Sequence, residues 1–73
     1  MSTDTVEALA DLAAPYGREV VLQAVTHESG MRLLRVRIRE GRRFTILDLD
    51  EATAARWGDV MRDWVTATGK AEQ

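Results

Sequence analysis

The arginines in the middle of the chain are the residues whose type and spacing most suggest binding chemistry. Between Met31 and Leu47 only Glu40 is acidic, whereas six residues are basic: Arg32, Arg35, Arg37, Arg39, Arg42 and Arg43. The planar guanidinium group pairs well with phosphate and carboxylate, often through two parallel hydrogen bonds. We therefore take Arg35, Arg37, Arg39 and Arg43 as the candidate interaction face.

Catalytic and metal-binding patterns are weak by comparison. His27, beside Glu28, is the sole histidine and the chain has no cysteine. A metal site needs three or four converging ligands, and histidine catalysis needs an orienting carboxylate and a nucleophile. No phosphate-binding glycine loop is present either. We expect His27 to be a surface or turn residue, and we expect no enzyme activity, no metal and no cofactor.

Acidic pairs and tryptophans have structural explanations. Asp48 and Asp50 precede a predicted helix, where either could be the N-cap, and the Asp59/Asp63 pair suits a solvated helix face. Trp57 and Trp64 are seven residues apart, so they share a helix face and are expected in the core.

The elements that position these residues can be predicted from periodicity. Asp4 and Glu7 have capping-box spacing, and Val6, Leu9, Ala10 and Ala13 then recur at helical intervals until Pro15 and Gly17. This pattern predicts a short N-terminal helix.

Three strands are predicted next, over residues 19–27, 31–39 and 43–49. Two-residue loops would set Gln23 against Val36 and Arg37 against Phe44. Three-residue loops would instead give one continuous apolar face, and we prefer that register. It aligns the following residues across the sheet: Val20, Leu22 and Ala24 with Leu34, Val36 and Ile38, and those with Phe44 and Ile46. The face opposite then holds the candidate arginines together with Val21, Val25, Leu33, Leu47 and Leu49.

A C-terminal helix is predicted from the acidic segment at residues 48–51 to Gly69. Its apolar stripe is expected to cover the sheet and comprises Thr53, Trp57, Val60, Met61, Trp64, Val65 and Thr68. The predicted fold is therefore α+β, ordered α-β-β-β-α, with a three-stranded antiparallel meander and the C-terminal helix packed on one face. We expect one domain over residues 1–73, with residues 1–3 and 70–73 as disordered tails.

Size and composition bear on assembly and location. The 73 residues are 45% hydrophobic and 30% charged, with a net charge of −2, which is typical of a globular chain. So short a chain has a small core and often needs a disulfide, a metal or a partner chain. Without cysteine, self-association as a homodimer is the expected supplement. The lack of cysteine, signal peptide and membrane span leads us to expect a cytoplasmic protein.

Three interpretations of the arginine face remain open. Long arginine stems could shield apolar neighbours and pair with acids of the first helix. The face could be a homodimer surface that meets acids of the other subunit. It could also bind nucleic acid, although the pI of 5.3 and the few aromatic residues fit this less well.

Residues 46–51, Ile-Leu-Asp-Leu-Asp-Glu, followed by Trp57 and Val60 in a helix, form a strand-to-helix junction similar to that of the PC4-like single-stranded-DNA-binding coactivators. The resemblance implies a dimer with Arg35, Arg37 and Arg39 as candidate contacts. The prediction departs from that family in having three strands instead of four, an extra first helix and no lysine-rich strand. We expect a non-catalytic interaction or accessory module acting as a homodimer, with a nucleic-acid-binding regulator as the alternative.

Overall fold

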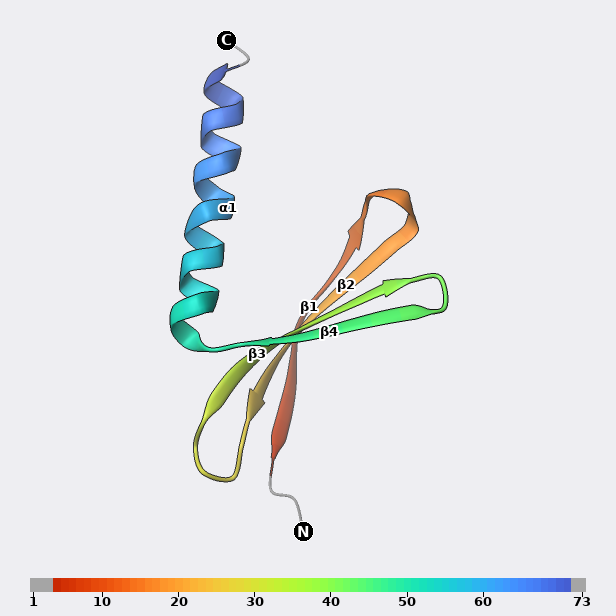
Figure 1. Ribbon diagram of the computed structural model, residues 1–73, viewed down its shortest axis with the longest axis vertical. Coiled ribbons are helices and arrows are strands. Elements are labelled where there is room, and N and C mark those ends of the chain that lie inside the picture. The colour runs from red at the N-terminus through yellow and green to blue at the C-terminus, as the bar shows by residue number, and fades with distance from the viewer. Residues whose placement is uncertain (1–3, 72–73) are drawn as a thin grey trace.

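A computed structural model describes the backbone of residues 4–71 and the side chains of residues 4–67. The chain forms a four-stranded antiparallel meander followed by one helix (Figure 1). The elements are β1 (Thr5–Ala14), the 3₁₀ turn η1 (Pro15–Gly17), β2 (Arg18–Thr26), β3 (Arg32–Glu40), β4 (Arg43–Leu49) and α1 (Glu51–Ala71). The α+β class is confirmed, with four strands in place of three. Of the predicted tails, residues 1–3, 72 and 73 lie outside the described residues.

The predicted N-terminal helix is wrong, because this segment is strand β1. Its pairing with β2 shifts register between Ala8 and Ala10, where a bulge adds one residue. The extra residue changes the alternation of apolar side chains midway along the strand, so Val6, Leu9 and Ala10 acquire a helix-like spacing. Asp4 does not form a capping box, since its carboxylate binds His27 and the backbone N–H of Glu28.

The register predicted for the first hairpin is confirmed. Val20, Leu22 and Ala24 lie opposite Ile38, Val36 and Leu34. The loop over residues 28–30 is closed by a 2.8 Å hydrogen bond from the His27 N–H to the Met31 carbonyl. Gly30 has φ +93°, a conformation that glycine adopts readily.

The register predicted for the second hairpin is wrong. Glu40 pairs with Arg43, so the connecting turn contains two residues, with Gly41 first at φ +60°. A glycine at the first position of a two-residue turn suits a type II′ hairpin. This turn places Leu34, Val36 and Ile38 opposite Leu49, Leu47 and Thr45. Every β4 side chain therefore lies on the face opposite to the one predicted.

The apolar sheet face, as we name it below, follows from these pairings. It comprises Ala10, Leu12, Val20, Leu22, Ala24, Leu34, Val36, Ile38, Leu47 and Leu49. Only Val25, Val36 and Leu49 are buried among the hydrophobic residues described, with 3%, 4% and 6% of their surface exposed. Val36 and Leu49 lie on the apolar sheet face, whereas Val25 pairs with Leu33 on the opposite face. On the apolar sheet face Leu12 and Leu47 are 50% and 43% exposed, and the remaining residues are half-buried.

The helix does not cover the apolar sheet face, in contrast to the prediction. One residue, Asp50, connects β4 to α1, and its Oδ1 accepts a 2.7 Å hydrogen bond from the Thr53 N–H as the N-cap. Only the start of α1 lies near β3, where Arg32 and Glu51 form a 3.0 Å ion pair. The rest of the helix stands away from the sheet (Figure 1).

The overall dimensions reflect this separation. The Cα radius of gyration is 15.0 Å and the longest extent is 55 Å. A compact chain of this length would have a radius of gyration of about 11 Å. The single chain is thus far less compact than a domain with its own closed core.

Candidate interaction surfaces

Three of the four candidate arginines share one sheet face. Arg35, Arg37 and Arg39 alternate along β3, and the β4 residues on their face are Phe44, Ile46 and Asp48. Arg43 pairs with Glu40 and therefore lies on the opposite face. The sheet face predicted for Arg43, Leu47 and Leu49 is wrong, because the β3–β4 turn is one residue shorter than expected.

Two of these arginines are held by carboxylates on neighbouring strands. Arg35 donates two hydrogen bonds to Asp48, with Nε–Oδ1 and Nη2–Oδ2 distances of 2.9 and 3.2 Å. Hydrogen bonding from Arg35 holds the pKa of Asp48 below its ordinary value, and the same interaction raises the pKa of Arg35. Arg39 Nε lies 3.2 Å from Glu19 Oε1, its cross-strand partner on β2.

Arg37 is engaged differently. Its guanidinium carbon lies 4.6 Å from the centre of the Phe44 ring, within the range of a cation–π contact. These two residues line a shallow depression with Asp11, Glu19, Val21 and Arg39. The face thus sets three arginines against Asp11, Glu19 and Asp48, so its formal charge is balanced. This pattern favours arginines that pair within the sheet, although the acids come from β1, β2 and β4 and not from a helix.

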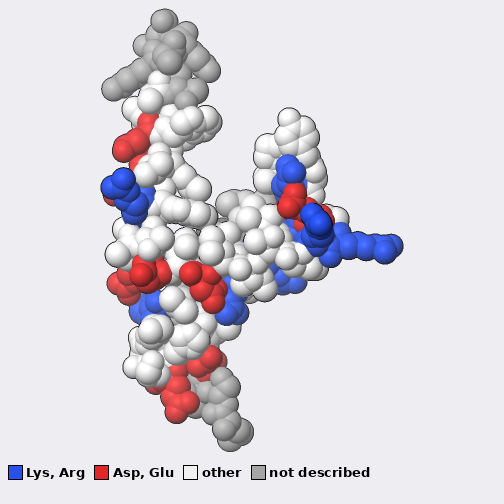
Figure 2. All heavy atoms as spheres, in the orientation of Figure 1, with Lys and Arg blue, Asp and Glu red and all other residues white. Residues whose placement is uncertain are grey.

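Unbalanced positive charge lies at the end of the sheet that carries the β3–β4 turn. Figure 2 shows arginine side chains gathered at this tip. Arg42 and Arg43 form no ion pair with any side chain that the structure describes, whereas Arg18 pairs with Glu40. Tyr16, in the adjacent turn, is 92% exposed with φ +65°.

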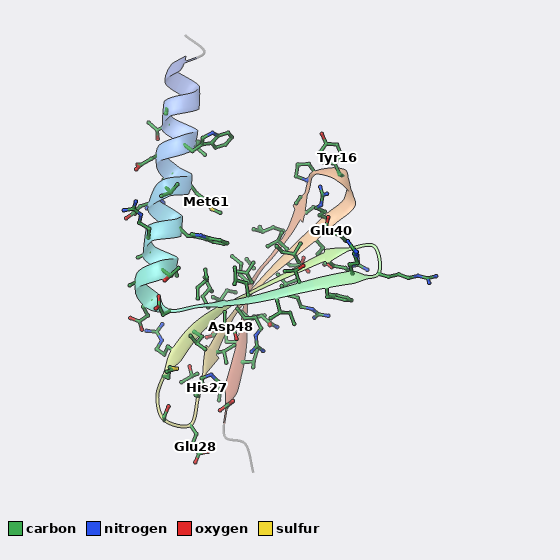
Figure 3. The ribbon with its side chains drawn as sticks, viewed as in Figure 1. Tyr16, His27, Glu28, Glu40, Asp48 and Met61 are labelled. Atoms are coloured by element: carbon green, nitrogen blue, oxygen red, sulfur yellow. The ribbon has the colours of Figure 1, made fainter. Side chains whose placement is uncertain are left out.

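His27 lies at the other end of the sheet, in the turn after β2 (Figure 3). Its Nδ1 is 3.0 Å from Asp4 Oδ2, and the Glu28 N–H donates to Asp4 Oδ1 at 3.2 Å. These contacts tie the start of β1 to the β2–β3 turn. Among residues 4–71, no three histidine or acidic side chains are grouped closely enough to hold a metal ion.

The two aspartates of the strand-to-helix junction have separate roles. Asp48 belongs to the arginine face, whereas Asp50 is the helix N-cap. Hydrogen bonds from the Thr53 side chain and backbone N–H lower the pKa of Asp50. Asp48 binds Arg35 and Asp50 binds Thr53, so the two aspartates have different partners.

A row of exposed apolar side chains lies on α1. Its helix stripe, as we name it below, comprises Trp57, Val60, Met61, Trp64 and Val65, which are 40–67% exposed. Met61 points to the side on which the sheet lies (Figure 3). The predicted stripe is therefore present but does not enter the core, and Thr68 lies outside the side chains described.

A groove lies between the base of α1 and the sheet, with a volume of about 340 Å³. Its apolar lining includes Leu9, Ala24, Leu34, Leu49 and Ala54, with Asp50 and Glu51 beside them. Figure 2 shows the molecule deeply notched between the helix and the sheet. The amphipathic helix was visible in the sequence, but the groove depends on where the helix leaves the sheet.

Comparison with known proteins gives one match. Residues 3–67 match the family described as "Family of unknown function (DUF6967)". No curated protein and no solved structure matches the chain. Within residues 4–71, no helix is long and apolar enough to cross a bilayer.

Proposed function

We propose that this chain, which belongs to the DUF6967 family of unknown function, is a non-catalytic interaction module that acts as a homodimer. The observation that carries the proposal is the exposure of the helix stripe, together with that of Leu12 and Leu47 on the apolar sheet face. Exposed apolar side chains grouped on one face of a helix are typical of an interaction site.

The energetics support a partner chain. With only Val25, Val36 and Leu49 buried, the described chain has little hydrophobic burial to offset the entropy lost on folding. The radius of gyration of 15.0 Å likewise exceeds the compact value of about 11 Å. A second copy of the chain presents the same apolar residues and could therefore cover those of the first.

The polar groups support a non-catalytic role. Arg35 and Asp48 neutralise each other, as do Arg39 and Glu19. Asp4 and His27 link two ends of strands. These pairs join neighbouring elements of the sheet, as structural ion pairs do, and they leave the arginine face without excess charge.

Single-stranded nucleic-acid binding is the second candidate, and a specific observation favours it. Arg37, Arg42 and Arg43 are not used in ion pairs among the described side chains, and Phe44 is 51% exposed beside Arg37. Arginine and exposed aromatic rings are the usual components of a surface that binds single strands. The four strands, with no helix before them in residues 4–71, also agree with the PC4-like fold.

Light scattering over a dilution series, at low and high salt, tests the proposal. We expect a mass of twice the 8.2 kDa chain mass, unchanged by salt because apolar contacts are not screened. Addition of a single-stranded oligonucleotide should not change it. A mass of one chain at every concentration would contradict the homodimer. An oligonucleotide complex that dissociates at high salt would support the second candidate, since polyanion binding releases counterions.

A further inference from the structure

From the proposed homodimer we infer its arrangement: α1 of each copy lies across the apolar sheet face of the other, in a reciprocal exchange about a two-fold axis. The inference rests on the proposed function and adds the site and its occupant. Each copy presents the helix stripe, which is 40–67% exposed, and the apolar sheet face, on which Leu12 and Leu47 are 50% and 43% exposed. Helix against sheet is a standard layer architecture, and a two-fold axis satisfies both surfaces at once.

The junction between β4 and α1 explains why the helix does not cover its own sheet. A single residue, Asp50, separates the two elements, and its carboxylate caps the helix through the Thr53 N–H. The Arg32–Glu51 ion pair also fixes the first turn against β3. With this junction, α1 leaves the end of β4 and stands away from its own sheet (Figure 1).

The helix and the strands that it would cross have similar lengths. The 21-residue helix is about 31 Å long, and the nine-residue strands β2 and β3 are about 30 Å long. A stable dimer buries about 800 Å² per partner, a small part of the 6166 Å² of this chain.

The groove at the base of α1 is the binding site that we assign to the helix of the other copy. Its lining of Leu9, Ala24, Leu34, Leu49 and Ala54 is apolar and its volume is about 340 Å³. The helix stripe carries Trp57 and Trp64, and tryptophan anchors in apolar pockets dominate many interfaces. A tryptophan of one copy inserted beside Leu34 of the other would fill this groove.

Complementation between two variants tests the exchange. Trp64→Lys disables the helix stripe, and Leu47→Glu disables the apolar sheet face. Each variant alone breaks both halves of a reciprocal interface, so each should dimerise at least about 100-fold more weakly than the wild type. In a mixture, the wild-type helix of the Leu47→Glu chain meets the wild-type sheet face of the Trp64→Lys chain. We expect a mixed dimer, detected by light scattering and native mass spectrometry.

The control substitutes the neighbouring residue on β4. Ile46 is 58% exposed and lies on the arginine face, whereas Leu47 is 43% exposed and lies on the apolar sheet face. Ile46→Glu should leave the dimer intact. If either disabling variant does not fold alone, recovery of its circular dichroism signal on mixing is the equivalent positive result.

The possible outcomes separate the reciprocal exchange from the homodimer itself. A wild-type dimer whose two variants do not complement each other would overturn the exchange and leave the homodimer standing, since helix–helix or sheet–sheet contacts give no rescue. A wild-type monomer would overturn both. A dimer lost in Ile46→Glu but kept in Leu47→Glu would place the interface on the arginine face, and would also overturn the inference.

Discussion

At the scale of single residues, the pairing of Arg35 with Asp48 determines the character of the arginine face. The alternation of Arg35, Arg37 and Arg39 along a strand could be read from the sequence and is present in the sheet. The pairing of Asp48 with Arg35 could not be predicted from the sequence, because an aspartate at this position fits a helix N-cap as well as a strand. Which of these roles it has depends on where β4 ends, and only the folded chain fixes that point.

The Arg35–Asp48 pair predicts a dependence of stability on pH. The folded pKa of Asp48 lies below its ordinary value of 3.8, which is also its value in the unfolded chain. Its contribution is therefore fully present above about pH 4 and is lost as the pH falls through the lower, folded pKa. We expect Asp48→Asn to lose stability relative to the wild type at pH 7, and the difference in unfolding free energy to shrink below about pH 4.

Urea unfolding at a fixed protein concentration, between pH 7 and pH 2, measures this difference. Asp59→Asn is the matched control, because Asp59 is exposed on α1 and forms no ion pair or hydrogen bond with the side chains described. A difference between wild type and Asp48→Asn that stays constant with pH would show that the ion pair is not the source of the effect.

At the scale of elements, the errors of sequence reading have local physical causes. The bulge in β1 gives a strand the apolar spacing of a helix, and alanine-rich composition adds to that impression. In the second hairpin, a turn of two residues in place of three reverses the faces of β4. Glycine was available for either turn, so composition alone did not separate them.

The two faces of β3 can be separated by a matched pair of substitutions at adjacent positions. Val36 is 4% exposed at the centre of the apolar sheet face, and its cross-strand neighbours Leu22 and Leu47 have no side-chain group that could hydrogen-bond to a carboxylate. We expect Val36→Asp to cost more than about 3 kcal/mol and to unfold the protein. Arg37→Ser removes only the contact with the exposed Phe44 ring and should cost about 1 kcal/mol or less.

Circular dichroism and thermal unfolding of the two variants give the comparison. If both variants are folded, or if only Arg37→Ser is unfolded, the assignment of the two β3 faces is wrong.

At the scale of the whole molecule, the decisive feature is a helix that leaves the sheet it was expected to cover. Its amphipathic pattern and the region in which it begins could both be predicted from the sequence. The surface on which the helix stripe docks could not be predicted. A helix that covers its own sheet has the same apolar pattern as a helix that covers the sheet of another chain. In the structure a single residue, Asp50, joins β4 to α1, and the helix stands away from its own sheet (Figure 1).

The most direct test of the central claim is an isotope-filtered NMR measurement on a dimer made from one labelled and one unlabelled chain. Such spectra detect only contacts between the two copies. The exchange predicts intermolecular cross-peaks from the Trp57 and Trp64 indoles to methyl groups of the apolar sheet face, such as those of Leu34 and Leu47. Intermolecular cross-peaks only between indoles, or only between residues of the arginine face, would contradict it.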